Sequence, residues 1–110
     1  MELSTVKSTP VDILMANGMT KTPDGQNILS LSQGFDSTGG AIYELNRTTY
    51  EATAILDIFY GNQFNALNDI RVASDGIIFF SDPVYGFERK LHNYLGSALY
   101  AYRYLNFSLS

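Results

Sequence analysis

The chain has 110 residues, nearly half of them apolar, and a formal net charge of −4. That length supports one domain at most, and the apolar share is enough to bury a core, which excludes a disordered chain. The negative charge, with no cluster of lysine or arginine, argues against nucleic acid and anionic membranes as partners. The absence of cysteine excludes a disulfide, a thiolate nucleophile and a cysteine-ligated zinc site.

The first ten residues are polar and end in Pro10, which predicts a flexible leader over residues 1–10. They lack the charged start and apolar block of a signal peptide. No stretch reaches the roughly 18 apolar residues of a membrane-spanning helix. We therefore expect no membrane partner. The sequence does not fix the compartment, and the cytoplasm is the default expectation.

From Val11 onward, short apolar runs alternate with turn residues, a pattern typical of an all-β fold. The high share of tyrosine and phenylalanine also favours strands. Pro23-Asp24-Gly25 and Ser74-Asp75-Gly76 have glycine where a tight turn needs a positive φ, and Pro83 predicts the end of a strand. The predicted strands are Met19–Thr22, Ile28–Ser32, Ala41–Leu45, Ala54–Asp57, Ile70–Ala73, Ile77–Ser81 and Ala98–Tyr104.

The chain repeats itself once, at a spacing of about fifty residues. Asn17 precedes the turn at Asp24-Gly25 by the same distance as Asn68 precedes the turn at Asp75-Gly76. Each turn leads into an apolar run that ends in serine, and a glycine-containing loop and a further strand follow each run. A unit of three or four strands at this period has the length of a β-propeller blade, about 40 to 50 residues.

The predicted fold class is therefore all-β, a β-propeller segment of about two blades. Residues 11–110 form one partial propeller domain, with blade units at about 11–60 and 61–110. An ordinary meander or sandwich is the alternative, but its hairpins need not repeat turn, strand and glycine loop in one order. Two blades do not close a ring, and an open stack leaves unpaired strand edges. We expect a partial chain, or identical copies that associate through the open propeller edges.

One stretch, Phe59–Gly86, carries a specific motif. It reads Phe64-Asn-Ala-Leu-Asn-Asp-Ile-Arg-Val72, then Ser74-Asp-Gly76, then an apolar run that closes on Ser81-Asp-Pro-Val-Tyr-Gly86. This stretch resembles the gluconolactonase/regucalcin (senescence-marker-protein) family, especially its fungal lactonase-like members. Gly39-Gly-Ala-Ile-Tyr-Glu-Leu45 is similar to the preceding blade, and weaker similarity extends from about Val11 to Tyr104.

The resemblance implies a six-bladed propeller that binds one divalent cation, calcium or zinc, at the mouth of its channel and hydrolyses lactones or related esters. Asn68 matches an asparagine that serves as a ligand at the family's metal site. A neutral amide oxygen suits a hard cation when carboxylates from other blades supply charge. Such a metal polarises the ester carbonyl and lowers the pKa of a bound water.

The chain departs from the family in several places. The glutamate, second asparagine and aspartate base that the family takes from other blades have no counterpart here. Ala66 stands where the regucalcin branch has an arginine that helps hold sugar acids, which puts sugar-lactone specificity in doubt. We expect one metal-site residue, Asn68, and no catalytic residue in this chain.

The remaining polar candidates are interpreted as structural. Asn17 occupies the repeat position equivalent to Asn68, but Gly18 follows it in place of an aspartate. Asp24 and Asp75 are turn formers, and Asp82 is expected to cap a strand end rather than face the channel.

Two aromatic features also receive structural interpretations. His92 has no nucleophile-elbow sequence near it and is expected to be a solvated loop histidine. Tyr100, Tyr102 and Tyr104 alternate with period two, which predicts one face of a strand rather than a platform for stacking bases.

The function hypothesis is a metal-dependent lactone or ester hydrolase of gluconolactonase type with a small-molecule lactone or ester as its partner, and this chain alone is expected to be inactive. The alternative is a non-catalytic β-propeller repeat that acts as a binding or structural module. Calorimetric titration with calcium separates the two, because such a module gives no metal heat.

Overall fold

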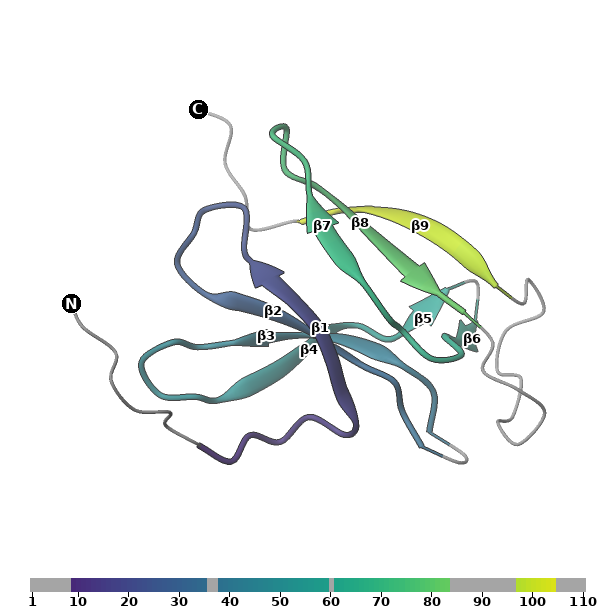
Figure 1. Ribbon diagram of the computed structural model, residues 1–110, viewed down its shortest axis with the longest axis horizontal. Helices are drawn as coiled ribbons and strands as arrows, with labels where there is room; N and C mark the ends of the chain where they lie inside the picture. Colours follow the sequence, from purple (N-terminus) through teal and green to yellow (C-terminus); the bar gives the residue numbers. More distant parts are fainter. Residues whose placement is uncertain (1–8, 36–37, 60, 84–96, 105–110) are drawn as a thin grey trace.

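The computed structural model describes residues 9–35, 38–59, 61–83 and 97–104, and every regular element within them is a β-strand. An antiparallel four-stranded sheet contains β1 (Ala16–Lys21), β2 (Ile28–Ser32), β3 (Ala41–Leu45) and β4 (Ala52–Leu56) in chain order. A second antiparallel sheet contains β7 (Ile70–Val72), β8 (Ile77–Asp82) and β9 (Ala98–Arg103). Figure 1 shows both sheets, with the short pair β5 (Ile58–Phe59) and β6 (Asn62–Gln63) beside β7–β9.

The all-β prediction is confirmed, and two antiparallel sheets in chain order fit a propeller-like segment rather than a closed ring. Within the described ranges, no helix is long and apolar enough to cross a membrane. The leader over residues 1–10 and the unit boundary after residue 60 stay predictions. Residues 1–8 and residue 60 lie outside the described part of the chain.

Both predicted turns have the same hydrogen-bonded design. Gly25 has φ 74° and Gly76 has φ 88°, the left-handed region that favours glycine. In each turn the preceding aspartate accepts a hydrogen bond from the backbone two residues on: Asp24 Oδ1 from Gln26 N at 2.9 Å, and Asp75 Oδ1 from Ile77 N at 3.0 Å. The turn-forming roles of both aspartates follow from these bonds.

The strand bounds differ from the sequence prediction mainly at β1, which begins at Ala16 rather than Met19. Ala16 pairs with Ser32 and Met19 pairs with Ser30, so β1 has one residue more than β2 between these pairs. That irregularity is a β-bulge at Asn17 and Gly18. β8 ends at Asp82, one residue later than the predicted Ser81 and directly before Pro83, which was predicted to end the strand.

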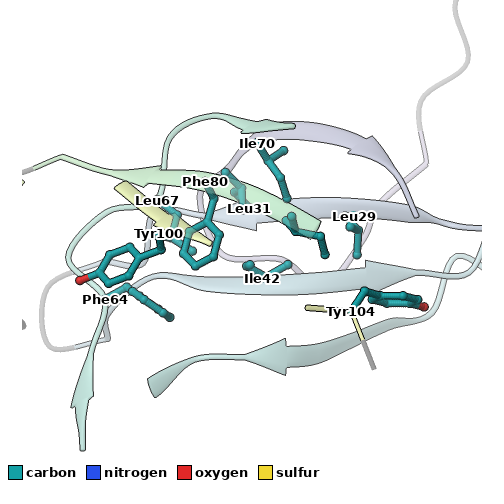
Figure 2. Close-up of a cluster of buried hydrophobic side chains, with 10 residues drawn as sticks. Leu29, Leu31, Ile42, Phe64, Leu67, Ile70, Phe80, Tyr100 and Tyr104 are labelled. Carbon is teal, nitrogen blue, oxygen red and sulfur yellow. The ribbon is translucent and has the colours of Figure 1, made fainter. Parts of the chain in front are cut away.

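The core lies between the two sheets. Leu29, Leu31 and Ile42 from the first sheet are fully buried against Ile78 and Phe80 of the second. Burying a side chain of this size contributes about 1.5–3 kcal/mol, so the shared core holds the sheets together. Figure 2 shows Phe64, Phe80 and Tyr100 gathered at one end of this core, with Leu29 and Tyr104 toward the other end.

The rings at the first end belong to Phe64, Phe80 and Tyr100. Tyr100 stacks on Phe80 with ring centroids 5.4 Å apart and meets Phe64 edge-on at 5.2 Å. Phe64 comes from the segment between the sheets, so its burial fixes the chain that leads into β7. The packing therefore positions the Asn68 region as well as the strands.

Candidate functional site

Asn68 lies just before β7, where the chain pairs with the end of β8. Its backbone N–H donates to Ser81 O at 3.0 Å, and the Ser81 N–H donates to Asp69 O at 3.0 Å. The Ser81 hydroxyl accepts a further hydrogen bond from Asp69 N at 3.1 Å. These bonds fix the backbone N–H of Asn68 and the backbone N–H and C=O of Asp69, the residue that follows it.

Asp82 fixes the segment that precedes Asn68. Its side chain is fully buried, and its two carboxylate oxygens accept hydrogen bonds from Asn65 N at 2.9 Å and Ala66 N at 2.6 Å. A buried carboxylate is stable only where such donors replace water. The structure therefore shows Asp82 holding backbone groups of a neighbouring segment, a contact that the sequence did not predict.

Asn68 lines a pocket of about 410 Å³ beside the second sheet. The half-buried amide of Asn68 and the hydroxyl of Ser81 supply polar atoms, and exposed Leu99 supplies apolar surface. The remaining lining residues are Pro83, Ser97 and Ala98. The pocket is a shallow, open depression rather than an enclosed cavity, with a few polar groups beside apolar surface.

Asn17, interpreted from the sequence as structural, contacts Asn68 directly. The Asn17 Nδ2 group donates to Asn68 Oδ1 at 3.0 Å and to Leu67 O at 3.2 Å. The two repeat-equivalent asparagines therefore meet where the two sheets adjoin. Sequence reasoning missed this contact, although the equal repeat positions of the two residues were the signal that could have indicated it.

The described residues alone do not fit a complete metal site. They contain no group of three or more histidine, cysteine, aspartate or glutamate side chains placed to hold an ion. The neighbouring carboxylate of Asp69 pairs with Arg71 at 3.2 Å, on the exposed surface. Asn68 Oδ1 accepts one hydrogen bond already and has one further lone pair to offer. A set of three carboxylate or imidazole ligands would have to draw on residues outside the described ranges.

A second polar pocket of about 330 Å³ lies on the first sheet. Glu44 and Glu51 contribute carboxylates to it, and Asn27, Asn46, Thr53 and Ile55 complete its lining. Glu44 accepts hydrogen bonds from Asn27 Nδ2 at 2.7 Å and from the Tyr104 hydroxyl at 2.6 Å. The carboxylate of Glu44 thus ties the end of the second sheet to the first.

The other sequence candidates are placed as follows. Tyr100 and Tyr104 are buried and Tyr102 is half-buried, as a strand face requires. His92 lies outside the described residues. Among the sequence candidates that lie in the described part of the chain, Asn68 lines the 410 Å³ pocket.

Comparison with curated proteins finds a likeness to a gluconolactonase of Zymomonas mobilis. The two chains are 32% identical over 71 residues, which cover 64% of this chain but 18% of the relative. The chain thus matches less than a fifth of that protein's length. No protein-family model matches the chain, and no solved structure matches it. The likeness supports a gluconolactonase-like relationship.

Proposed function

We propose that this chain is part of a lactone hydrolase of gluconolactonase type and contributes Asn68 to the wall of its substrate site. The observation that carries the proposal is the position of Asn68. It is held by backbone bonds on both sides, lines the 410 Å³ pocket, and lies in the motif that resembles the family. The likeness to a gluconolactonase also supports it.

The substrate class is a small cyclic ester. Hydrolysis adds water to the ester carbonyl and breaks the ring C–O bond, which yields a hydroxy acid. An amide fixed in the wall of a pocket can bind and orient such a substrate through hydrogen bonds. A divalent metal, calcium or zinc, would supply carbonyl polarisation in the intact hydrolase. We also propose, as part of the same function, that the chain is related to the regucalcin branch of the family and to its fungal lactonase-like members.

This chain by itself is expected to be inactive, because the glutamate, second asparagine and aspartate base of the family have no counterpart in its sequence. Glucono-1,5-lactone should therefore hydrolyse at the spontaneous rate in its presence, with calcium or zinc added. Acceleration by a verified 110-residue monomer would contradict this part of the proposal.

A chimera tests the hydrolase proposal itself. The 71 aligned residues of this chain replace the matching stretch of the Zymomonas gluconolactonase. Lactone hydrolysis by the chimera is then measured. The proposal predicts activity above background that falls at least tenfold in the Asn68→Ala chimera. Equal activity of the two chimeras would contradict it, as would no activity in a chimera whose thermal melt shows that it folds.

A further inference from the structure

The bulge at the start of β1 directs one side chain across to the other unit. Asn17 is half-buried, and its Nδ2 group spans two acceptors, Leu67 O at 3.2 Å and Asn68 Oδ1 at 3.0 Å. An amide nitrogen carries two hydrogens, so both of its donors are used by these acceptors. The Asn17 side chain thus contacts both Leu67 and Asn68, which lead into β7.

Gly18 permits this approach. Its backbone N–H donates to Asn68 O at 3.1 Å. A Cβ atom at position 18 would lie 2.5 Å from the same carbonyl oxygen, closer than real Cβ contacts allow. The sequence difference that separates the two repeats, glycine after Asn17 and aspartate after Asn68, therefore has a steric reason at this junction.

The orientation of both amides follows from the contact with Leu67. A backbone carbonyl only accepts hydrogen bonds, so the Asn17 atom that faces it has to be the nitrogen. The same nitrogen meets the Asn68 side chain, and the atom that it meets there has to be the oxygen. Asn68 is held with Oδ1 toward Asn17, which directs its Nδ2 group away from that contact.

We propose that Asn17 is a positioning residue that fixes the amide orientation of Asn68 across the junction of the two units. The assignment rests on the proposed function only in that Asn68 is taken as the site residue. Asn17 acts through Asn68 and is given no contact with the substrate. Its effect is to hold the side-chain amide of Asn68 in a single orientation relative to the pocket before any ligand binds.

The test is an NMR measurement on the folded, ¹⁵N-labelled 110-residue chain. In the wild type, the side-chain amide of Asn68 should be rigid, with an order parameter near the value of about 0.85 that is typical of fixed groups. In Asn17→Ala the order parameter should fall below about 0.6, because no donor then holds Oδ1. A rigid and unshifted Asn68 amide in this variant would overturn the proposal.

Asn17→Asp has the same size and keeps the test decisive if Asn17→Ala does not fold. A carboxylate has no hydrogen to donate, so Asn68 should turn its Nδ2 group toward position 17. A downfield shift of one Asn68 amide proton is the expected signature, and its absence in a folded Asn17→Asp chain would contradict the assignment. Ile42→Val, a core change in the first sheet, is the matched control and should leave both Asn68 signals unchanged.

Failure of this inference is distinguishable from failure of the proposed function. The amide measurements use no lactone and no metal, so they stand or fall on the Asn17–Asn68 contact alone. If Asn17 variants mobilise Asn68 but lactone never perturbs the Asn68 signals, the positioning role survives and the lactone site does not. If lactone perturbs Asn68 equally in the wild type and in Asn17→Ala, and the amide stays rigid, the positioning role is overturned.

Discussion

Two buried tyrosines, Tyr100 in β9 and Tyr104 directly after it, differ in one hydrogen bond. Tyr104 is 4% exposed and donates its hydroxyl to Glu44, whereas Tyr100 is 8% exposed. Among the described side chains, the Tyr100 hydroxyl is a buried polar atom with no hydrogen-bond partner. Burial without a partner is unfavourable for a hydroxyl, so the two residues should respond oppositely to the same substitution.

Tyr100→Phe should raise the free energy of unfolding by about 1 kcal/mol, because it removes an unsatisfied buried group and keeps the ring. Tyr104→Phe should lower it by about 2 kcal/mol, because a hydrogen bond to a carboxylate is lost. Urea denaturation of both variants measures the difference. A destabilised Tyr100→Phe variant would show that this hydroxyl has a partner in solution.

Tyr100 should also make stability depend on high pH. Burial raises the pKa of its phenol above the ordinary value of 10.0, and the negative charge of Asp82 raises it further. The folded state therefore disfavours ionisation, and the contribution is full below pH 10.0 and is lost as pH rises through the higher folded value. The fall in stability above pH 10.0 should be shallower in Tyr100→Phe than in the wild type. An equal fall of the unfolding free energy with pH in the two proteins, measured by denaturation at several pH values, would contradict this.

At the scale of elements, the end of β8 controls the segment that leads to Asn68. The two carboxylate oxygens of Asp82 accept hydrogen bonds from the backbone N–H groups of Asn65 and Ala66. In Asp82→Asn one of these oxygens is replaced by an NH₂ group, which cannot accept, so one of the two N–H groups loses its acceptor. We expect a loss of about 1–3 kcal/mol and faster hydrogen exchange at these two amides. Asp75→Asn is the control, since an exposed asparagine can still accept from Ile77 N. Equal stabilities of the two variants would contradict a structural role for Asp82.

The sequence predicted most strands because their apolar runs are bounded by strong turn residues. β2 and β3 have the predicted bounds, and glycine takes a positive φ in both tight turns. β5 and β6 were missed, because two-residue strands show no periodicity. The earlier start of β1 was missed as well, since Asn17 and Gly18 interrupt its apolar pattern at the bulge.

The site was predicted only in part. Asn68 was identified through a motif, because residue type and spacing are visible in a sequence. Its contact with Asn17 was not predicted, since it depends on how two sheets adjoin across a separation of 51 residues. The double backbone contact of Asp82 likewise depends on burial and loop geometry. Tertiary contacts of this kind leave no local pattern.

At the scale of the whole molecule, the outer face of the second sheet exposes two large apolar side chains. Phe79 is 41% exposed and Leu99 is 72% exposed, on the side of the sheet opposite Phe80 and Tyr100. β9 also pairs with β8 alone in the described part of the chain. An exposed apolar face beside an open strand edge promotes association.

We expect the purified chain to self-associate reversibly, as the open edges predict. A Phe79→Thr, Leu99→Thr double variant should shift sedimentation toward the monomer at every concentration, because threonine keeps strand propensity and removes apolar surface. Tyr50→Asn, at an exposed aromatic in the β3–β4 connection, is the control and should sediment like the wild type. A wild-type chain that stays monomeric at high concentration would contradict the expectation.

We propose that Asn68 belongs to a site for a small lactone. Titration of the ¹⁵N-labelled chain with glucono-1,5-lactone, followed by its side-chain and backbone amide signals, tests this most directly. Saturable shifts are expected at Asn68, Ser81 and Leu99, which line one pocket, and these shifts should be lost in Asn68→Ala. Shifts that persist unchanged in Asn68→Ala, or a titration that leaves these three residues unperturbed, would contradict it.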